Sequence, residues 1–364
     1  MDDFQGIELT LEDYWRAIIL LGKNVTSYKF ALAKSLLELA PKGKSIITLE
    51  ELAEPFSRHI CEHLRSAELK GLPLSESQGQ PTQNSYKAIE ICKDFHLGNI
   101  DRDELIQKIR KEGFKVVLDK FHNVNSQETT KKFYEKLKRG KGITLTDELH
   151  QLIERYQYQN LPGEVDSRWQ SNEIAWGTGI SRNLISVNYD EDKKLFFIAS
   201  DREKERRIDV TSSRGALNAY QQGKCFYCLA DISIVSGSPN LADVDHFFAL
   251  SLANRGFLIG RINKLWNLVL ACKTCNSSKS DNLPHSKYLN KLIERNEFLT
   301  KSPIKYKATH NKYHLLRTSI VEQTGNSQES RYMFLRLTYA KAQKLTGINK
   351  GEGWTVPIVE NMKG

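Results

Sequence analysis

The sequence predicts an α+β protein, in which a mostly helical chain carries one small cysteine-closed module towards its C-terminus. Two observations indicate helix: apolar residues recur at helical spacing over the first ~70 residues, and the same spacing returns after residue 286. A third observation sets the module apart. Four of the six cysteines form two Cys-x-x-Cys pairs that bracket about forty residues of mixed, partly strand-like sequence.

The amino-acid composition indicates a globular protein without a membrane-spanning segment. The 364 residues are enough for two or three domains, and 40% hydrophobic with 27% charged residues is ordinary for a globular chain. No segment approaches the roughly 18 consecutive apolar residues of a membrane span, and "MDDFQGIELT" lacks the order of a secretory signal. We therefore expect a cytoplasmic protein without a membrane partner. The net charge of +9 favours polyanions such as nucleic acid, although solvated lysines explain it equally well.

Residues 1–163 are expected to form a mainly helical region, for which the sequence suggests no role. Gly22 follows an amphipathic run and is expected to be a C-terminal helix glycine. Thr48 and Glu51 have the spacing of a capping box, and Pro55 should kink or divide the helix that follows them. A polar loop is expected at 72–85. The predicted helices lie at 11–22, 26–41, 48–71, 101–113, 128–142 and 146–157.

The second half of the chain changes character. Residues 164–211 are expected to form a short mixed connector, in which "NLISVNYDEDKKLFFIAS" predicts a hairpin with an acidic turn. Residues 212–290 form the cysteine-closed module, which opens with a short helix at 212–224. Residues 291–364 should be helical again.

The paired cysteines predict a structural metal site. Each Cys-x-x-Cys pair can chelate with two sulfurs, and two pairs supply the four thiolates of a closed tetrahedral zinc site. A reducing compartment disfavours disulfides, so metal ligation is the better interpretation. Cys61 and Cys92 lack such a neighbour and are expected to be small buried hydrophobic residues. The predicted zinc ligands are Cys225, Cys228, Cys272 and Cys275.

Polar residues stand between and beside the cysteine pairs in a definite order. Asp245 and His246 lie in "DVDHF", Asn267 begins the apolar strand "NLVLAC", and Asn276 follows the last cysteine in "CNSSK". In this order and spacing, residues 223–281 resemble the HNH family of nucleases, whose fold is the ββα-metal fold, in its four-cysteine zinc-stapled form. Asn276 departs from the many members that have histidine at this position, but both side chains can ligate a divalent ion.

The resemblance implies a role for each residue. His246 would be the general base, Asp245 and Asn276 would bind catalytic Mg²⁺ or Mn²⁺, and Asn267 would brace the loop that carries His246. The chemistry is consistent, because phosphodiester hydrolysis needs a base that works near neutral pH and a cation that stabilises charge on the phosphoryl oxygens. Oxygen ligands suit Mg²⁺ or Mn²⁺. DNA is the expected substrate, and RNA is a less favoured one. Each active site is expected to cut one strand at a time, so that a single site nicks the duplex.

Other interpretations remain open at this stage. Lys279, Arg261 and Lys264 could contact phosphate, or they could be solvated side chains. The module could be a zinc ribbon that binds nucleic acid without cutting it. The segment "HICEH" at 59–63 matches an inverted zinc-protease pattern, but two partly exposed histidines on a helix are the better prediction. By analogy with other nucleases of this type, the helical regions suggest a bacterial restriction or anti-phage system, with partner proteins or a homo-oligomer.

Overall fold

The fold is described from a computed structural model, in which the chain divides into two compact units, Met1–Gly179 and Ile180–Gly364. Each unit is described by itself. The described residues are 10–22, 26–69, 87–124, 127–177, 187–190, 195–199, 207–258, 261–300, 315–349 and 351–357. Among these residues, no helix has the length and apolar character needed to cross a membrane.

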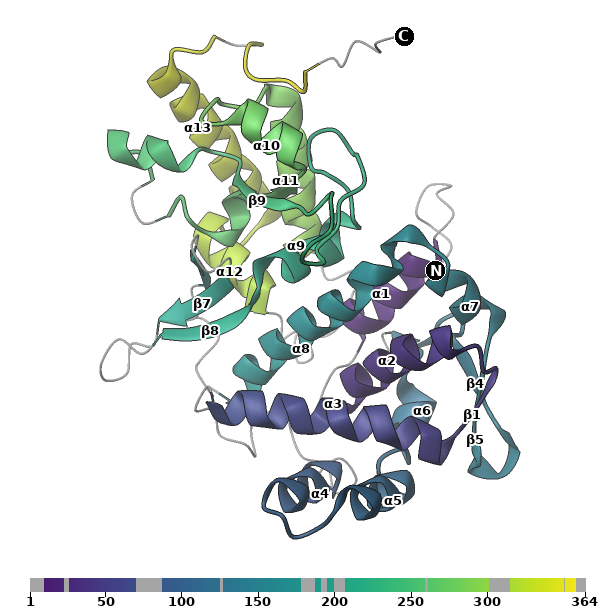
Figure 1. The fold of residues 1–364 in the computed structure, drawn as a ribbon. Coiled ribbons are helices and arrows are strands. Elements are labelled where there is room, and N and C mark those ends of the chain that lie inside the picture. Colours follow the sequence, from purple (N-terminus) through teal and green to yellow (C-terminus); the bar gives the residue numbers. More distant parts are fainter. Residues whose placement is uncertain are drawn as a thin grey trace. The chain divides into compact units, whose positions relative to one another are not determined.

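Unit 1 is built around one buried helix, α2 (Tyr28–Leu39), which lies between α3 and α8 (Figure 1). Helix α3 packs in turn on α4 and α5. The other helices of the unit are α1 (Leu11–Leu21), α3 (Leu49–Leu69), α4 (Lys87–His96), α5 (Arg102–Glu112), α6 (Val117–Lys120), α7 (Asp147–Ile153) and α8 (Leu161–Gly177), with 3-10 turns η1 (Ala40–Lys42), η2 (Lys138–Gly140) and η3 (Tyr156–Asn160).

A small antiparallel sheet closes one side of unit 1. Its strands are β1 (Ile46–Thr48), β5 (Gly142–Leu145) and β4 (Tyr134–Lys136), in that spatial order. A two-residue pair, β2 (Asn123–Val124) and β3 (Gln127–Glu128), accompanies it. The helix predicted over 128–142 is therefore wrong. Phe133 and Tyr134 are buried, and Phe133 packs edge-on against Trp15 at 5.0 Å between ring centroids. This packing, with pairing to β5, outweighs the local helical preference.

Three local predictions in unit 1 have different outcomes. The capping box is confirmed, because the Thr48 N–H donates to Glu51 at 2.9 Å and the Glu51 N–H donates to Thr48 Oγ1 at 3.2 Å. Pro55 neither ends nor divides α3, which runs through it. Gly22 follows α1, but its φ of −62° is not left-handed. A side chain there would meet the carbonyl oxygen of Ile18 at 2.3 Å, so close approach of the chain explains this glycine.

Unit 2 opens with a three-stranded antiparallel sheet in the order β6-β7-β8. The predicted hairpin is confirmed by β6 (Val187–Asp190) and β7 (Leu195–Ala199), which pair antiparallel; turn residues 191 and 192 lie outside the described residues. The sequence did not indicate the third strand, β8 (Arg207–Ser212). Helix α9 (Ser213–Gln221) follows β8 at once and leads into the first cysteine pair.

The rest of unit 2 is a second antiparallel pair, β9 (Asp243–His246) and β10 (Leu268–Ala271), with four helices after it (Figure 1). Helix α11 packs against α12 and α13, and α12 contacts the 3-10 turn η6 (Leu265–Asn267) ahead of β10. The predicted cysteine-closed module and helical C-terminal region are thus parts of one unit. The helices are α10 (Lys273–Lys279), α11 (Ser286–Thr300), α12 (Leu315–Thr324) and α13 (Gln328–Thr346), and η5 (Leu250–Arg255) is a further turn.

Candidate functional site

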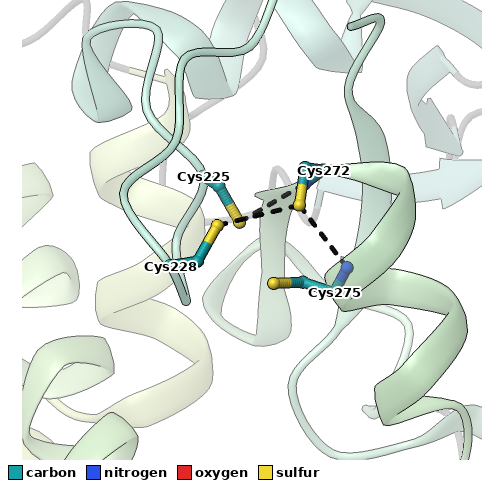
Figure 2. A group of neighbouring side chains, drawn as sticks. All are labelled: Cys225, Cys228, Cys272 and Cys275. Carbon is teal, nitrogen blue, oxygen red and sulfur yellow. Dashed lines mark hydrogen bonds between the residues drawn. The ribbon is translucent and has the colours of Figure 1, made fainter. Parts of the chain in front are cut away.

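The four cysteines of the two Cys-x-x-Cys pairs meet at one point in unit 2 (Figure 2). Their sulfur atoms all lie within 4.8 Å of one another, and Cys228 Sγ is 3.8 Å from Cys272 Sγ. A tetrahedron with Zn–S bonds of about 2.3 Å has edges of about 3.8 Å, so the cluster fits a zinc ion. Among the described residues, no other group of three or more His, Cys, Asp or Glu side chains is close enough to share a metal.

Backbone N–H groups donate hydrogen bonds to two of the four sulfur atoms, and such bonds stabilise negative charge on sulfur. The Cys272 N–H donates to Cys225 Sγ at 3.3 Å, and the Cys275 N–H donates to Cys272 Sγ at 3.4 Å (Figure 2). Burial, together with the neighbouring Cys225, raises the pKa of the Cys275 thiol. A zinc ion bound here would compensate the negative charge of four thiolate ligands. Cys61 and Cys92 are buried away from this cluster in unit 1, as predicted.

Strand β9 carries two of the predicted site residues, Asp245 and His246, and pairs with β10. Asp245 lies opposite Val269, and His246 lies opposite Leu268 in the antiparallel register. Because alternate residues of a strand share a face, Asp243 and Asp245 belong to one face of β9. Helix α10 follows β10 directly, with Cys272 as its N-terminal cap, and contacts β9. The site is thus a strand pair followed by a short helix, tied by the cysteines.

The Asp245 carboxylate is held at both oxygens. Tyr227 Oη donates to Oδ2 at 2.5 Å, and Lys279 Nζ donates to Oδ1 at 2.9 Å and to the His246 carbonyl at 2.8 Å. All three side chains are buried. Burial and the adjacent carboxylate raise the pKa of Tyr227 well above its usual value, so the hydroxyl remains a donor.

Two further contacts fix the polar side chains around Asp245. His246 Nε2 lies 2.8 Å from the Oδ1 atom of Asn263, which orients the imidazole ring. The Asn276 amide donates to Asp243 Oδ2 at 3.3 Å, which brings a second carboxylate beside α10. Asp243 and Asn276 therefore meet where β9 contacts α10, and Asp245 and His246 follow Asp243 on the same strand. The carboxylate and amide oxygens of Asp243, Asp245 and Asn276 are the ligand type that a hard divalent cation takes.

Asn267 lies fully buried in the turn before β10 and uses its whole amide on the backbone. Its Oδ1 accepts the Phe248 N–H at 2.8 Å, and its Nδ2 donates to the carbonyls of Phe248 and Ile262 at 2.9 Å each. The side chain thereby joins the segment that follows His246 to the loop that precedes β10.

The predicted phosphate contacts are all engaged within the protein. Lys279 is 0% exposed, so its alternative as a solvent-facing lysine is wrong, and its ammonium is occupied by Asp245. Arg261 donates to the Gln323 carbonyl on α12 and lies over the Phe334 ring at 5.0 Å. Lys264 is buried, and burial lowers its pKa. Lys279 and Lys264 are thus buried, whereas Arg261 remains exposed to solvent.

The "HICEH" segment lies on α3, and its histidines differ from the prediction because both are buried rather than partly exposed. His63 contacts Glu173 at 3.1 Å and Asp166 at 3.3 Å and stacks on Trp169, with ring centroids 3.5 Å apart. Because His59 and His63 do not converge with a third ligand among the described residues, this segment forms no metal cluster there.

Sequence reasoning missed Tyr227, Asp243 and Asn263. Two of them had a signal: Tyr227 lies between two zinc-ligand cysteines, and Asp243 is two residues before Asp245 on the same strand face. Asn263 stands in a loop of no regular pattern. Comparison with known protein families, with curated proteins and with solved structures finds no significant match to this chain.

Proposed function

We propose that this chain is a metal-dependent endonuclease that hydrolyses phosphodiester bonds in DNA and is stabilised by a structural zinc ion. One observation carries the proposal: β9, which holds Asp243, Asp245 and His246, is joined to α10 by the Asn276–Asp243 and Lys279–Asp245 contacts, and the four-cysteine cluster ties the start of α10. The order of these residues is also that of the nuclease family which residues 223–281 resemble.

Each side chain has a role in the proposed reaction. His246, oriented by Asn263, takes the proton from the attacking water. Asp245 and Asn276 would hold the divalent cation, with Asp243 as a further oxygen donor on the same strand face. When bound, that cation supplies positive charge to the phosphoryl and leaving oxygens. Asn267 keeps the chain after His246 in place through its three backbone contacts.

The zinc ion has no reactive role in this proposal. Four cysteine ligands fill a tetrahedral shell and leave no position for water or substrate. Its contribution is to the stability of the loop before β9 and of α10, which the four cysteines tie together.

The test is cleavage of supercoiled and linear DNA by the full chain with Mg²⁺ or Mn²⁺, followed by EDTA. We expect wild type to convert supercoiled plasmid to nicked circles, since one active site cuts one strand at a time, and EDTA to stop the reaction. His246→Ala should lower the rate by about 100- to 10,000-fold, the usual contribution of a general base. His285→Ala is the matched control, because His285 lies in the same unit and uses Nδ1 to accept the Lys287 N–H.

Two outcomes would contradict the proposal. If wild type binds DNA but cuts neither strand with either metal, the module is a binding-only zinc ribbon. If His246→Ala cuts as fast as wild type, the histidine is not the base.

A further inference from the structure

The Asp245 carboxylate is unusual in the site because two buried side chains from different segments hold it. Tyr227 donates to one oxygen at 2.5 Å and Lys279 to the other at 2.9 Å. Tyr227 is 4% exposed and Lys279 is 0% exposed. A buried carboxylate needs such donors, because taking its charge out of water without them is very unfavourable.

Both donors belong to segments that the cysteine cluster ties together. Tyr227 stands between Cys225 and Cys228, so its backbone is fixed by the first pair. Lys279 ends α10, whose first turn contains Cys275 and whose N-terminal cap is Cys272. Each cysteine pair therefore fixes the segment whose side chain donates to one oxygen of Asp245.

These contacts leave the carboxylate able to bind a cation. Each carboxylate oxygen has two lone pairs, so an oxygen that accepts one hydrogen bond can still ligate a metal. Carboxylates that ligate metals are commonly held by hydrogen bonds from outside the ligand shell, and removal of such a partner typically costs 10- to 100-fold in metal affinity or activity.

We infer that Tyr227 and Lys279 are positioning residues, which transmit the geometry of the cysteine cluster to Asp245 and fix its carboxylate for the divalent cation. The inference rests on the proposed function in that Asp245 is taken to be a cation ligand. In this arrangement the zinc site sets the affinity of a second, different metal site through two side chains.

Tyr227→Phe tests the inference, because it removes one hydroxyl and changes neither charge nor ring volume. The readouts are zinc content, melting temperature and the dissociation constant for Mn²⁺, followed through the paramagnetic resonance signal of free Mn²⁺. We expect one zinc per chain as in wild type, a folded protein, and Mn²⁺ binding that is about 10- to 100-fold weaker. The Mn²⁺ concentration for half-maximal cleavage should rise by the same factor.

Tyr339→Phe is the matched control. Tyr339 is also 4% exposed and also donates its hydroxyl, in this case to the Pro284 carbonyl at 2.7 Å, but it does not contact Asp245. This variant should bind Mn²⁺ as wild type does. A purely structural role for Tyr227 would lower the melting temperature in both variants and leave Mn²⁺ affinity unchanged in both, which would overturn the inference.

A second variant covers the case in which Tyr227→Phe does not fold. Asp245→Glu keeps the carboxylate but moves it by one methylene, so it cannot keep both the 2.5 Å and the 2.9 Å contacts in place. We expect Mn²⁺ affinity to fall at least about 10-fold, and wild-type affinity would overturn the inference.

The inference and the proposed function can fail separately. If Asp245→Asn leaves Mn²⁺ binding unchanged, Asp245 is not a ligand and the inference is wrong, whether or not the protein cuts DNA. If Mn²⁺ binding weakens as expected in Tyr227→Phe but wild type cuts no DNA, the positioning role stands and the proposed nuclease activity fails.

Discussion

Asn267 and Asn276 are the same residue type in the same module, yet their surroundings differ. Asn267 is 0% exposed and makes all three of its contacts with backbone groups, so its amide is enclosed by the chain around it. Asn276 is half-buried on α10 and reaches the Asp243 carboxylate. In the proposed function, Asn267 therefore braces the backbone and Asn276 is the cation ligand.

Substitution by alanine should separate these roles. Asn267→Ala is expected to lower cleavage at saturating Mn²⁺ by about 100-fold, because a base displaced by about 1 Å loses that much rate. Asn276→Ala should instead raise the Mn²⁺ concentration for half-maximal cleavage, and Asn276→His should retain more activity since imidazole can still ligate. Cleavage rate against Mn²⁺ concentration for the three variants measures this. Rescue of Asn267→Ala, but not of Asn276→Ala, by extra Mn²⁺ would mean that the roles are reversed.

At the scale of elements, the sequence predicted best where strand pattern and cysteine spacing coincide. β9 and β10 were expected from alternating or apolar runs next to the cysteines, and both formed. The predicted helix at 128–142 became strands because Phe133 and Tyr134 are buried against residues far along the chain, which local periodicity cannot show. For the same reason, local periodicity could not predict that Lys279 pairs with Asp245, which lies 34 residues earlier in the chain.

His122 joins two elements of unit 1 and makes the stability of that unit depend on pH. It lies between α6 and β2, and its Nε2 accepts the Phe133 N–H, just before β4, at 3.0 Å. Burial, with Lys132 and Lys29 nearby, lowers its pKa to about 3. The unfolded chain, with a histidine pKa near 6.5, binds more protons between these values, so stability is lost as pH falls from about 6.5 towards 3.

His59 and His63 also titrate in unit 1, so the pH dependence of wild type alone does not isolate His122. We therefore compare the loss of free energy of unfolding in wild type with the loss in His122→Gln. His59, with a pKa lowered to about 4, adds to the loss, whereas the raised pKa of His63 opposes it. Between pH 7 and 5.5, wild type should lose about 1 kcal/mol more of its free energy of unfolding than His122→Gln, whose amide oxygen can accept the same N–H. Urea unfolding, followed by pulsed hydrogen exchange of unit 1 peptides, measures this. Equal losses would show that His122 is not held neutral.

At the scale of the whole molecule, the candidate site belongs to one unit. The cysteines, β9, β10 and α10 all lie in unit 2, and α11 supports them from within the same unit. Arg295 of α11 is buried and donates to the Leu268 carbonyl at 2.7 Å, and Asn296 donates to the Trp266 carbonyl at 3.0 Å. These bonds hold the turn that contains Asn267. The helical C-terminal region is therefore part of the support of the site.

Removal of zinc should act on one unit and spare the other. A structural zinc site of this kind contributes on the order of 10 kcal/mol in small domains, so unit 2 should lose its fold when a chelator or Cys228→Ser removes the ion. Unit 1 has its own core, including Trp15 and Trp169, and should stay folded. Hydrogen exchange of the full chain should show β9, β10 and α10 exchanging at least about 100-fold faster without zinc, with α2 and α3 unchanged.

Cys61→Ala is the control for zinc removal, because Cys61 is a buried cysteine of unit 1 outside the cluster. Protection of β9 and β10 in zinc-free protein would contradict the structural role of the ion, and simultaneous loss of α2 and α3 would show that the two units fold as one.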